Sequence, residues 1–258
     1  MSTVDHDQDV TISDADVDFF RTNGYFRLDR ITTDDEVARL RVLYDQVMAD
    51  QRAWRVVYEG DANDGDTINQ VFLPELQAPE MGDTGYFRNA RRIAAAFFGI
   101  DESEVQPGGL MLIYKPPTGG REAPWHQDEA FWDDKNHLKC NSLSVWMPLD
   151  DVVVESGAMQ FLPGSHANDV LPHRSQVNEP LFLDVDVDVS GAVACPLSAG
   201  GATFHHCRTL HHTARNTSGR PRRAMTTIFH GPHAERAVPL DKPWTRGLKA
   251  PAQGQGQG

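Results

Sequence analysis

The second half of the chain constrains the fold most. After Gly109, short apolar runs alternate with Pro, Gly and Asp residues that favour turns. This texture is typical of an all-β sandwich or barrel, because short half-buried strands must be joined by frequent turns. The strands that it predicts are Leu110–Tyr114, Trp125–Glu129, Ser142–Leu149, Met159–Leu162, Ala202–Phe204 and Arg223–Phe229. We therefore expect a mainly β fold here.

The N-terminal part is predicted to begin with a short helix and a strand. Ser13 followed by Asp16 resembles a capping box, in which each residue satisfies a backbone N–H of the other. Gly24 is a typical helix stop. The alternation in Tyr25–Leu28 then indicates a strand.

Two further helices are predicted before the β-rich part. Thr33 is a good N-cap, and three acidic residues follow it at the positive helix end, so a helix is expected to run to about Asp50. The Ala-rich segment Arg88–Phe98, which Gly99 ends, predicts the third helix. These helices are expected to support one sheet of the β fold.

The remaining segments are predicted to be less regular. The Gly/Asp/Asn-rich residues Gly60–Asp66 indicate a loop. Within Glu179–Leu197, the alternation DVDVDV predicts a half-buried edge strand. We expect a flexible tail over residues 1–11, a single domain over 12–248, and a disordered tail over 249–258 that ends in GQGQG.

Composition narrows the class of protein. Among 258 residues, 24 Lys and Arg stand against 37 Asp and Glu, a formal net charge of −13 at pH 7. Phosphate recognition needs clustered Lys and Arg, so nucleic acid and anionic membrane surfaces are not expected as partners. The sequence contains no run of 18 apolar residues, so no membrane-spanning helix is predicted. Three cysteines without Cys-x-x-Cys spacing favour a cytoplasmic protein.

The stretch PWHQDEAFW, Pro124–Trp132, is a candidate metal motif. On an extended strand, residues two apart share one face, with Cα atoms roughly 6–7 Å apart. An imidazole and a carboxylate at His126 and Asp128 can therefore hold one metal ion. The following Phe131 and Trp132 either wall a substrate pocket or fill the barrel.

A facial site of two histidines and one carboxylate needs a second histidine from distant sequence. The segment GGATFHHCRTLHHTARNTSGRPRRAM offers His205, His206, His211 and His212. His205 and His211 share a strand parity, but the backbone can turn between them, so parity alone does not choose a ligand.

Three separated motifs resemble one enzyme family. They are WHQDEAFW, the run VWMPLDDVVVESGAMQFLPGSH from Val145 to His166, and LHHTARNTSGRPRRA from Leu210 to Ala224. Their order is similar to that in the phytanoyl-CoA dioxygenase family of Fe(II)/2-oxoglutarate oxygenases, and the N-terminal DFFRTNGYFRL extends the likeness. The resemblance implies a double-stranded β-helix, a cupin-like jelly roll, with N-terminal helices buttressing one sheet.

The resemblance also implies roles for single residues. In the family, the distal histidine precedes an Asn by five residues and an Arg by eleven, and both Asn216 and Arg222 lead back to His211. His126, Asp128 and His211 are then the implied Fe(II) ligands. Arg222 is the implied partner of the far carboxylate of 2-oxoglutarate, and its planar, permanently charged fork suits that carboxylate.

Three more residues match positions that line the co-substrate pocket of the family. Thr213 matches a hydroxyl position that contacts 2-oxoglutarate, whereas Trp146 and Met111 match wall positions. His212 departs from the family pattern, which commonly has Gly there. Core packing is an equally good interpretation of Trp146 and Met111 from the residues alone.

Other polar residues have ordinary interpretations. Lys115, before Pro116-Pro117, could approach an acidic substrate, but a solvated loop is the expected interpretation. Gln127 and Glu129 should face away from the metal if their strand is regular. His205 and His206 are expected to pack or to support a ligand.

The implied activity is that of a dioxygenase with Fe(II), 2-oxoglutarate and O₂. It would hydroxylate or otherwise oxidise an unactivated C–H bond of a small molecule, such as an amino acid or a natural-product intermediate, and release succinate and CO₂. Asp128 favours oxygenation, because related halogenases lack this carboxylate. The alternative is a non-catalytic jelly-roll protein with a structural or sensory metal, which would have no use for Arg222.

Overall fold

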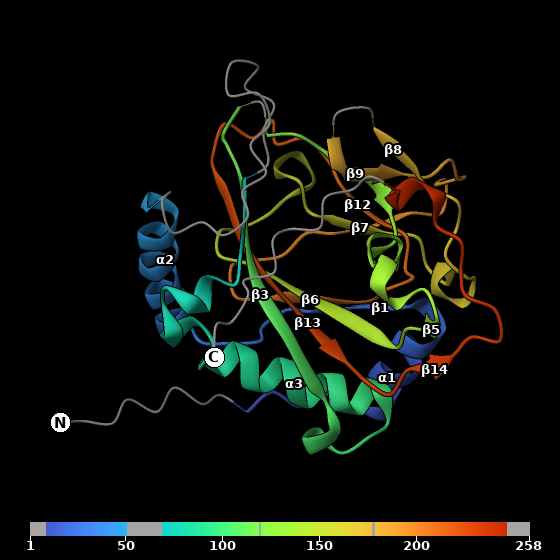
Figure 1. Cartoon of the computed structure of the whole chain (residues 1–258). Coiled ribbons are helices and arrows are strands. Elements are labelled where there is room, and N and C mark those ends of the chain that lie inside the picture. Colours follow the sequence, from blue (N-terminus) through green and yellow to red (C-terminus); the bar gives the residue numbers. More distant parts are fainter. Residues whose placement is uncertain (1–8, 51–68, 119, 177–178, 247–258) are drawn as a thin grey trace, which may run out of the picture.

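Two antiparallel sheets and three helices make up the computed structural model, which describes residues 9–50, 69–118, 120–176 and 179–246. Three helices lie along the side of the larger sheet (Figure 1). The fold is the double-stranded β-helix that the sequence predicts. In the described part of the chain, no helix is long and apolar enough to cross a membrane.

The three helices form close to where their capping residues predict. Their bounds are α1 (Asp14–Asn23), α2 (Asp34–Ala49) and α3 (Gly85–Phe98). The capping box at Ser13 is present, and Gly24 takes the left-handed conformation at φ 77°. The third helix begins three residues earlier than predicted, because the Thr84 hydroxyl accepts a hydrogen bond from the Phe87 N–H and caps it.

The strands fall into one six-stranded sheet, one four-stranded sheet and two two-stranded sheets. The six-stranded sheet has the order β1-β11-β6-β13-β3-β2 and the four-stranded sheet the order β10-β7-β12-β4. Strands β5 and β14 pair with each other, as do β8 and β9. The bounds are β1 (Tyr25–Leu28), β2 (Asn69–Phe72), β3 (Gln106–Lys115), β4 (Ala123–His126), β5 (Leu138–Lys139), β6 (Ser142–Pro148), β7 (Met159–Phe161), β8 (Arg174–Gln176), β9 (Glu179–Asp184), β10 (Val193–Cys195), β11 (Ala202–His206), β12 (His211–Thr213), β13 (Arg222–His230) and β14 (Ala234–Glu235).

Short 3₁₀ turns join these elements. They are η2 (Pro74–Leu76), η3 (Pro79–Met81), η4 (Glu102–Glu104), η5 (Asp128–Phe131), η6 (Asp133–Lys135), η7 (Val154–Ser156), η8 (Ser165–Ala167) and η9 (Pro243–Thr245).

Two strand predictions are wrong in part. The strand expected over Trp125–Glu129 ends at His126, and Asp128 begins the 3₁₀ turn η5, because the Glu129 N–H donates to Cys207 O and the Ala130 N–H to Gln127 O. The alternating Asp184–Val189 segment has alternating burial but no strand assignment beyond Asp184.

Some predictions fall outside the described residues. The loop at Gly60–Asp66, the first eight residues of the N-terminal tail and the tail at 249–258 belong to this group. Strand β2, which lies within a segment of irregular pattern, was not predicted. Residues 9–11 have no helix or strand.

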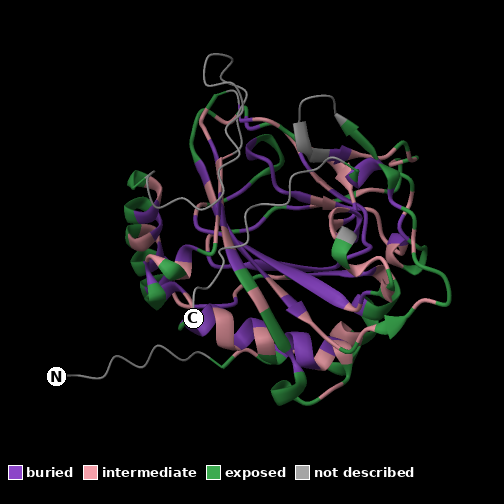
Figure 2. Ribbon diagram, viewed as in Figure 1, coloured by how far each residue is buried: buried purple, intermediate pink, exposed green. Residues whose placement is uncertain are grey.

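Each face of the larger sheet contributes to a different core. On β6, Leu143, Val145 and Met147 pack with the helices, whereas Trp146 points to the opposite side and packs toward the smaller sheet. This follows from the alternation of side chains along a strand. The strand is buried along its whole length, as the continuous purple of its ribbon shows (Figure 2). The inner face therefore lies between the two sheets.

A buried carboxylate joins two of the helices. Glu36 of α2 is 1% exposed, and its two carboxylate oxygens accept hydrogen bonds from the Gly85 and Tyr86 N–H groups, each at 2.9 Å. These N–H groups lie in the first turn of α3, where an intrahelical partner is lacking. Glu36 thus satisfies the start of α3 from a different helix.

We predict that Glu36→Gln lowers the free energy of unfolding by about 2 kcal/mol, because an amide cannot accept both N–H groups with the strength of a carboxylate. Urea unfolding followed by circular dichroism measures the change. Asp35→Asn is the matched control, since Asp35 is exposed in the same turn. Its expected cost is about 0.5 kcal/mol. Equal losses in both variants would contradict the role of the buried hydrogen bonds.

Candidate metal and co-substrate site

Three of the predicted ligands come together on the inner face of the smaller sheet. His126 ends β4 and pairs in register with His211, the first residue of β12. The Nε2 atoms of His126 and His211 lie 3.8 Å and 3.4 Å from Oδ1 of Asp128. One ligand atom from each residue lies within 4.8 Å of the others, a spacing at which all three can hold one metal ion.

Backbone carbonyls fix the tautomers of both histidines. Nδ1 of His126 lies 2.6 Å from Pro124 O, and Nδ1 of His211 lies 2.9 Å from Thr209 O. A carbonyl only accepts, so Nδ1 carries the proton and Nε2 keeps a free lone pair for a metal. Burial, followed by the neighbouring His211, lowers the pKa of His126 to about 3 and keeps its ring neutral.

Asp128 is held as a carboxylate by its neighbours. The Ser144 hydroxyl donates to Oδ2 at 2.6 Å, and Nε2 of His205 lies 3.3 Å from the same atom. Burial raises the pKa of Asp128, but the neighbouring imidazoles of His211 and His205 outweigh it, so the pKa lies well below its ordinary value. Two imidazoles and one anionic carboxylate suit a divalent ion such as Fe(II).

The structure separates His211 from the alternative candidates. His212 faces the other side of its strand, where its ring stacks on Trp125 at 5.3 Å and lies 3.9 Å from Glu122. There it lines a surface cavity of about 510 Å³ on the outer side of the sheet. His206 is buried beside Arg208. His205 contacts Asp128, in agreement with a supporting role.

Arg222 lies at the start of β13 with an unusual lack of partners. It is 1% exposed, and its Nε and Nη1 atoms have no hydrogen-bond partner among the described residues. Its guanidinium lies 5.5 Å from the centre of the Trp146 ring, a cation–π distance. Burial lowers its pKa to about 10. Buried polar groups are rarely left unpaired, so these donors fit an anionic ligand.

The other predicted pocket residues share the inner face. Met111 of β3, Thr226 of β13 and Trp146 of β6 are direct cross-strand neighbours and form one row. Thr213 of β12 has the strand parity of His211, and Lys115 donates to its hydroxyl at 2.8 Å. Trp146 also belongs to the apolar core on the inner face. It can therefore pack in this core and line the predicted pocket at the same time.

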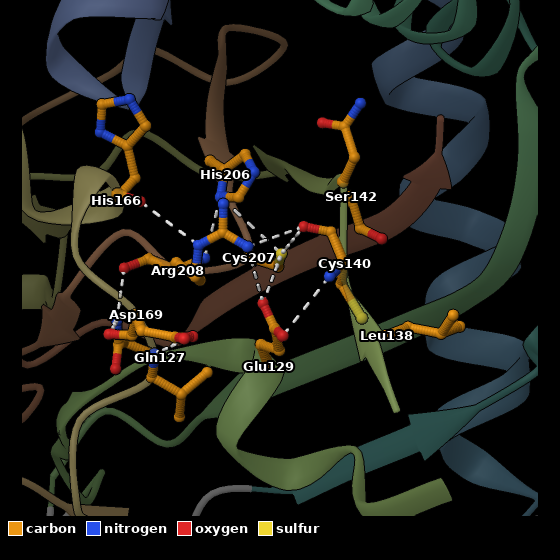
Figure 3. A network of polar contacts seen from close by, with 12 residues as sticks. Gln127, Glu129, Leu138, Cys140, Ser142, His166, Asp169, His206, Cys207 and Arg208 are labelled. Carbon is orange, nitrogen blue, oxygen red and sulfur yellow. Dashed lines mark hydrogen bonds and ion pairs between the residues drawn. The ribbon is translucent and has the colours of Figure 1, made fainter. Parts of the chain in front are cut away.

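The residues on either side of Asp128 are anchored away from the metal ligands. Figure 3 shows the Glu129 side chain within a polar network that includes Arg208. Glu129 is 1% exposed and accepts from Arg208 at 3.2 Å and from Arg236 at 2.9 Å. Gln127 donates to Arg208 O and accepts from Leu171 N. Both side chains face away from the metal ligands, as predicted, although the backbone is a turn.

Two residues near the site were missed or misjudged from sequence. Ser144 was not singled out, although in SLSVW it alternates with apolar residues on a buried strand. Lys115 was expected in a solvated loop, and that prediction is wrong, because Lys115 is 0% exposed at the end of β3. The adjacent Pro116-Pro117 pair suggested a loop one residue too early.

Comparison with known proteins agrees with this geometry. The phytanoyl-CoA dioxygenase family model matches residues 20–224. Phytanoyl-CoA dioxygenase domain-containing protein 1 of Danio rerio is 30% identical over 141 residues, 52% of this chain but only 47% of that protein. A probable alpha-ketoglutarate-dependent hypophosphite dioxygenase of Stutzerimonas stutzeri is 35% identical over 218 residues, 78% of this chain and 73% of that protein.

A solved structure is similar over nearly the whole chain. EvdO2 from Micromonospora carbonacea var. aurantiaca, crystallised in complex with 2-oxoglutarate, superposes with a TM-score of 0.79 and 36% sequence identity. The superposition covers 92% of this chain and 98% of EvdO2. The likeness therefore includes both sheets and the helices beside them.

We predict that Ser144→Ala weakens binding of Fe(II) about tenfold, because the hydroxyl that orients the Asp128 carboxylate is lost. Anaerobic calorimetry with Fe(II), or with Mn(II) in its place, measures the affinity. Ser142→Ala is a matched control on the same strand, since the Ser142 hydroxyl contacts Nδ1 of His230. Unchanged affinity in Ser144→Ala would contradict the proposed orientation of Asp128.

We predict that the stability of the fold depends on pH through His173. This residue is 5% exposed, and its Nε2 accepts a hydrogen bond from the Gln127 N–H. Burial lowers its pKa to about 4, below the ordinary value of 6.5. As pH falls through 6.5 the unfolded state takes up this proton first, so stability decreases from there toward pH 4. The slope from this group is at most about 1.4 kcal/mol per pH unit.

Urea unfolding of the protein at several pH values measures this slope. His173→Gln removes the titrating group and should flatten the dependence between about pH 6.5 and 5. An identical slope in the variant would show that other groups cause it.

Proposed function

The chain belongs to the phytanoyl-CoA dioxygenase family of Fe(II)- and 2-oxoglutarate-dependent enzymes, and we propose that His126, Asp128 and His211 are its iron ligands and that Arg222 binds its 2-oxoglutarate. The observation that carries this proposal is the pair formed by the triad and the unpartnered, buried guanidinium. A metal would be held by the first, and an anion would satisfy the free donors of the second.

Fe(II) and 2-oxoglutarate would supply the oxidation, and the residues of the site would hold them. When bound, Fe(II) with 2-oxoglutarate and O₂ supplies the oxidation that converts a C–H bond to C–OH, and it yields succinate and CO₂. With Nδ1 turned to a backbone carbonyl, His126 and His211 would present Nε2 to the ion, while Asp128 contributes one negative charge. Three protein ligands would leave other positions on the ion open for the keto acid and O₂.

Arg222 fixes the direction of the keto acid in this proposal. Its fork binds the far carboxylate in a buried setting, where charge-assisted hydrogen bonds are strong. Trp146 packs against the guanidinium and restricts its orientation. Because Arg222 and Trp146 are themselves buried, water is kept from competing for the guanidinium donors.

The aromatic end of the metal motif supports a substrate wall. The Phe131 ring meets the His126 ring edge-on at 5.6 Å, beside the proposed iron ligand. Trp132 lies farther away, against His230 at 6.1 Å and under Lys135 at 5.1 Å. We assign Phe131 to the substrate pocket and Trp132 to its outer support.

The substrate is a small molecule in this proposal, and an amino acid or a natural-product intermediate is the class favoured. Among the similar proteins, several enzymes are named for small molecules, namely ectoine, L-proline and hypophosphite. The acidic chain, with a net charge of −13, disfavours a large polyanionic substrate.

We predict that Asp128→Ala abolishes succinate formation from 2-oxoglutarate in the presence of Fe(II), O₂ and a turned-over substrate, because two histidines alone hold iron weakly. Mass spectrometry of candidate substrates for a gain of one oxygen, run beside a succinate assay, detects the reaction. Full turnover by Asp128→Ala would overturn the ligand assignment.

The non-catalytic alternative is separated by co-substrate binding. Calorimetry of the Fe(II)-loaded protein with 2-oxoglutarate should show saturable binding that Arg222→Met weakens at least tenfold. Iron binding without 2-oxoglutarate binding would instead support a structural or sensory metal. Arg220→Met is the matched control, because Arg220 is exposed two residues away.

A further inference from the structure

A buried lysine lies beside the proposed co-substrate site without a role in the scheme above. Lys115 ends β3 and pairs in register with Arg222 on β13. Both residues are almost fully buried, at 0% and 1% exposure. Like charges directly opposite each other on neighbouring strands destabilise a sheet, and buried charges are costly. Retaining a second cation here therefore calls for an explanation in the function of the site.

The Lys115 side chain reaches from the larger sheet to the smaller one. Its Nζ donates to Thr213 Oγ1 at 2.8 Å, to Thr213 O at 3.2 Å and to Ala214 O at 2.6 Å. Gly157 leaves room for this crossing, since a Cβ there would lie 3.3 Å from Nζ and 2.7 Å from Ala214 O. The ammonium thus ties down the end of β12, the strand that begins with His211.

The direction of the hydrogen bond to Thr213 has a chemical consequence. An ammonium group has only donors, so Thr213 Oγ1 must accept from Lys115. The hydroxyl proton is then left for a different acceptor. Thr213 shares the inner face with His211, and the adjacent cation makes its proton a better donor to an anion.

We propose that Lys115 is a positioning residue for the co-substrate: it holds the Thr213 hydroxyl as a donor toward the carboxylate that Arg222 binds. This inference rests on the proposed function, because Thr213 and Arg222 are assigned to 2-oxoglutarate there. Lys115 acts through Thr213 and contributes its positive charge to a buried anion site.

The test compares 2-oxoglutarate with 2-oxobutyrate, a keto acid of the same kind without the far carboxylate. Calorimetry on the Fe(II)-loaded protein under anaerobic conditions measures both affinities. Lys115→Met should weaken 2-oxoglutarate about tenfold and leave 2-oxobutyrate and Fe(II) unchanged. Lys139→Met is the matched control, since Lys139 is exposed on β5.

A double-mutant cycle tests whether Lys115 acts through Thr213. In a Thr213→Val background, Lys115→Met should cause little further loss of 2-oxoglutarate affinity, because the hydroxyl that it orients is already gone. Additive losses would overturn the positioning role. Equal weakening of both keto acids, or a loss of Fe(II) binding, would show a general structural role and also overturn it.

Failure of this inference differs from failure of the proposed function. If Arg222→Met weakens 2-oxoglutarate while Lys115→Met does not, the co-substrate site stands and the inference fails. If neither variant changes 2-oxoglutarate binding, the proposed function fails as well. Should Lys115→Met not fold, Lys115→Gln retains a donor without the charge, and unchanged 2-oxoglutarate affinity in that variant would overturn the contribution of the charge.

Discussion

The antiparallel register of β12 against β4 is the constraint on which the site depends. It sets His211 directly opposite His126, and the alternation along β12 places Thr213 on the same face and His212 on the other. A slip of one residue would present His212 and remove both His211 and Thr213 from the interior. The neighbouring pairing of β12 with β7 holds the same register from the other side. The backbone hydrogen bonds thereby determine which of two adjacent histidines faces the interior, although the two side chains are chemically the same.

Much of the fold was readable because its signals are local. The helix caps at Ser13 and Thr33 and the apolar runs of the central strands depend on neighbours in sequence, and they were predicted nearly to the residue. The proposed ligands were predicted from the order of the family motifs. Strand parity alone could not identify the second histidine. The end of β4 at His126 could not be predicted, because it depends on the Glu129 N–H meeting Cys207 O across the fold.

Lys115 and the alternating Asp184–Val189 segment show where local sequence signals lead to wrong predictions. Next to two prolines, a lysine has every local feature of a solvated loop, yet the facing carbonyls of β12 bury it. The aspartates alternate as an edge strand should, but after the Val185 N–H, which donates to Trp125 O of β4, the described segment does not continue as a strand. The hydrophobic period of a sequence indicates which side chains face inward. It does not indicate whether a partner strand is present.

The two cations on the inner face also bear on how binding and folding are coupled. A protein optimised only for stability would not leave the guanidinium of Arg222 buried with two nitrogens unpaired, since each unsatisfied group costs about 1–3 kcal/mol. An anion that satisfies these donors binds the folded state alone, and it stabilises that state more the further its concentration exceeds its dissociation constant. The local cost in the free protein is therefore the same feature that makes the site selective for a carboxylate, and the rigid sheet pairing around Arg222 keeps the side chain from escaping to water.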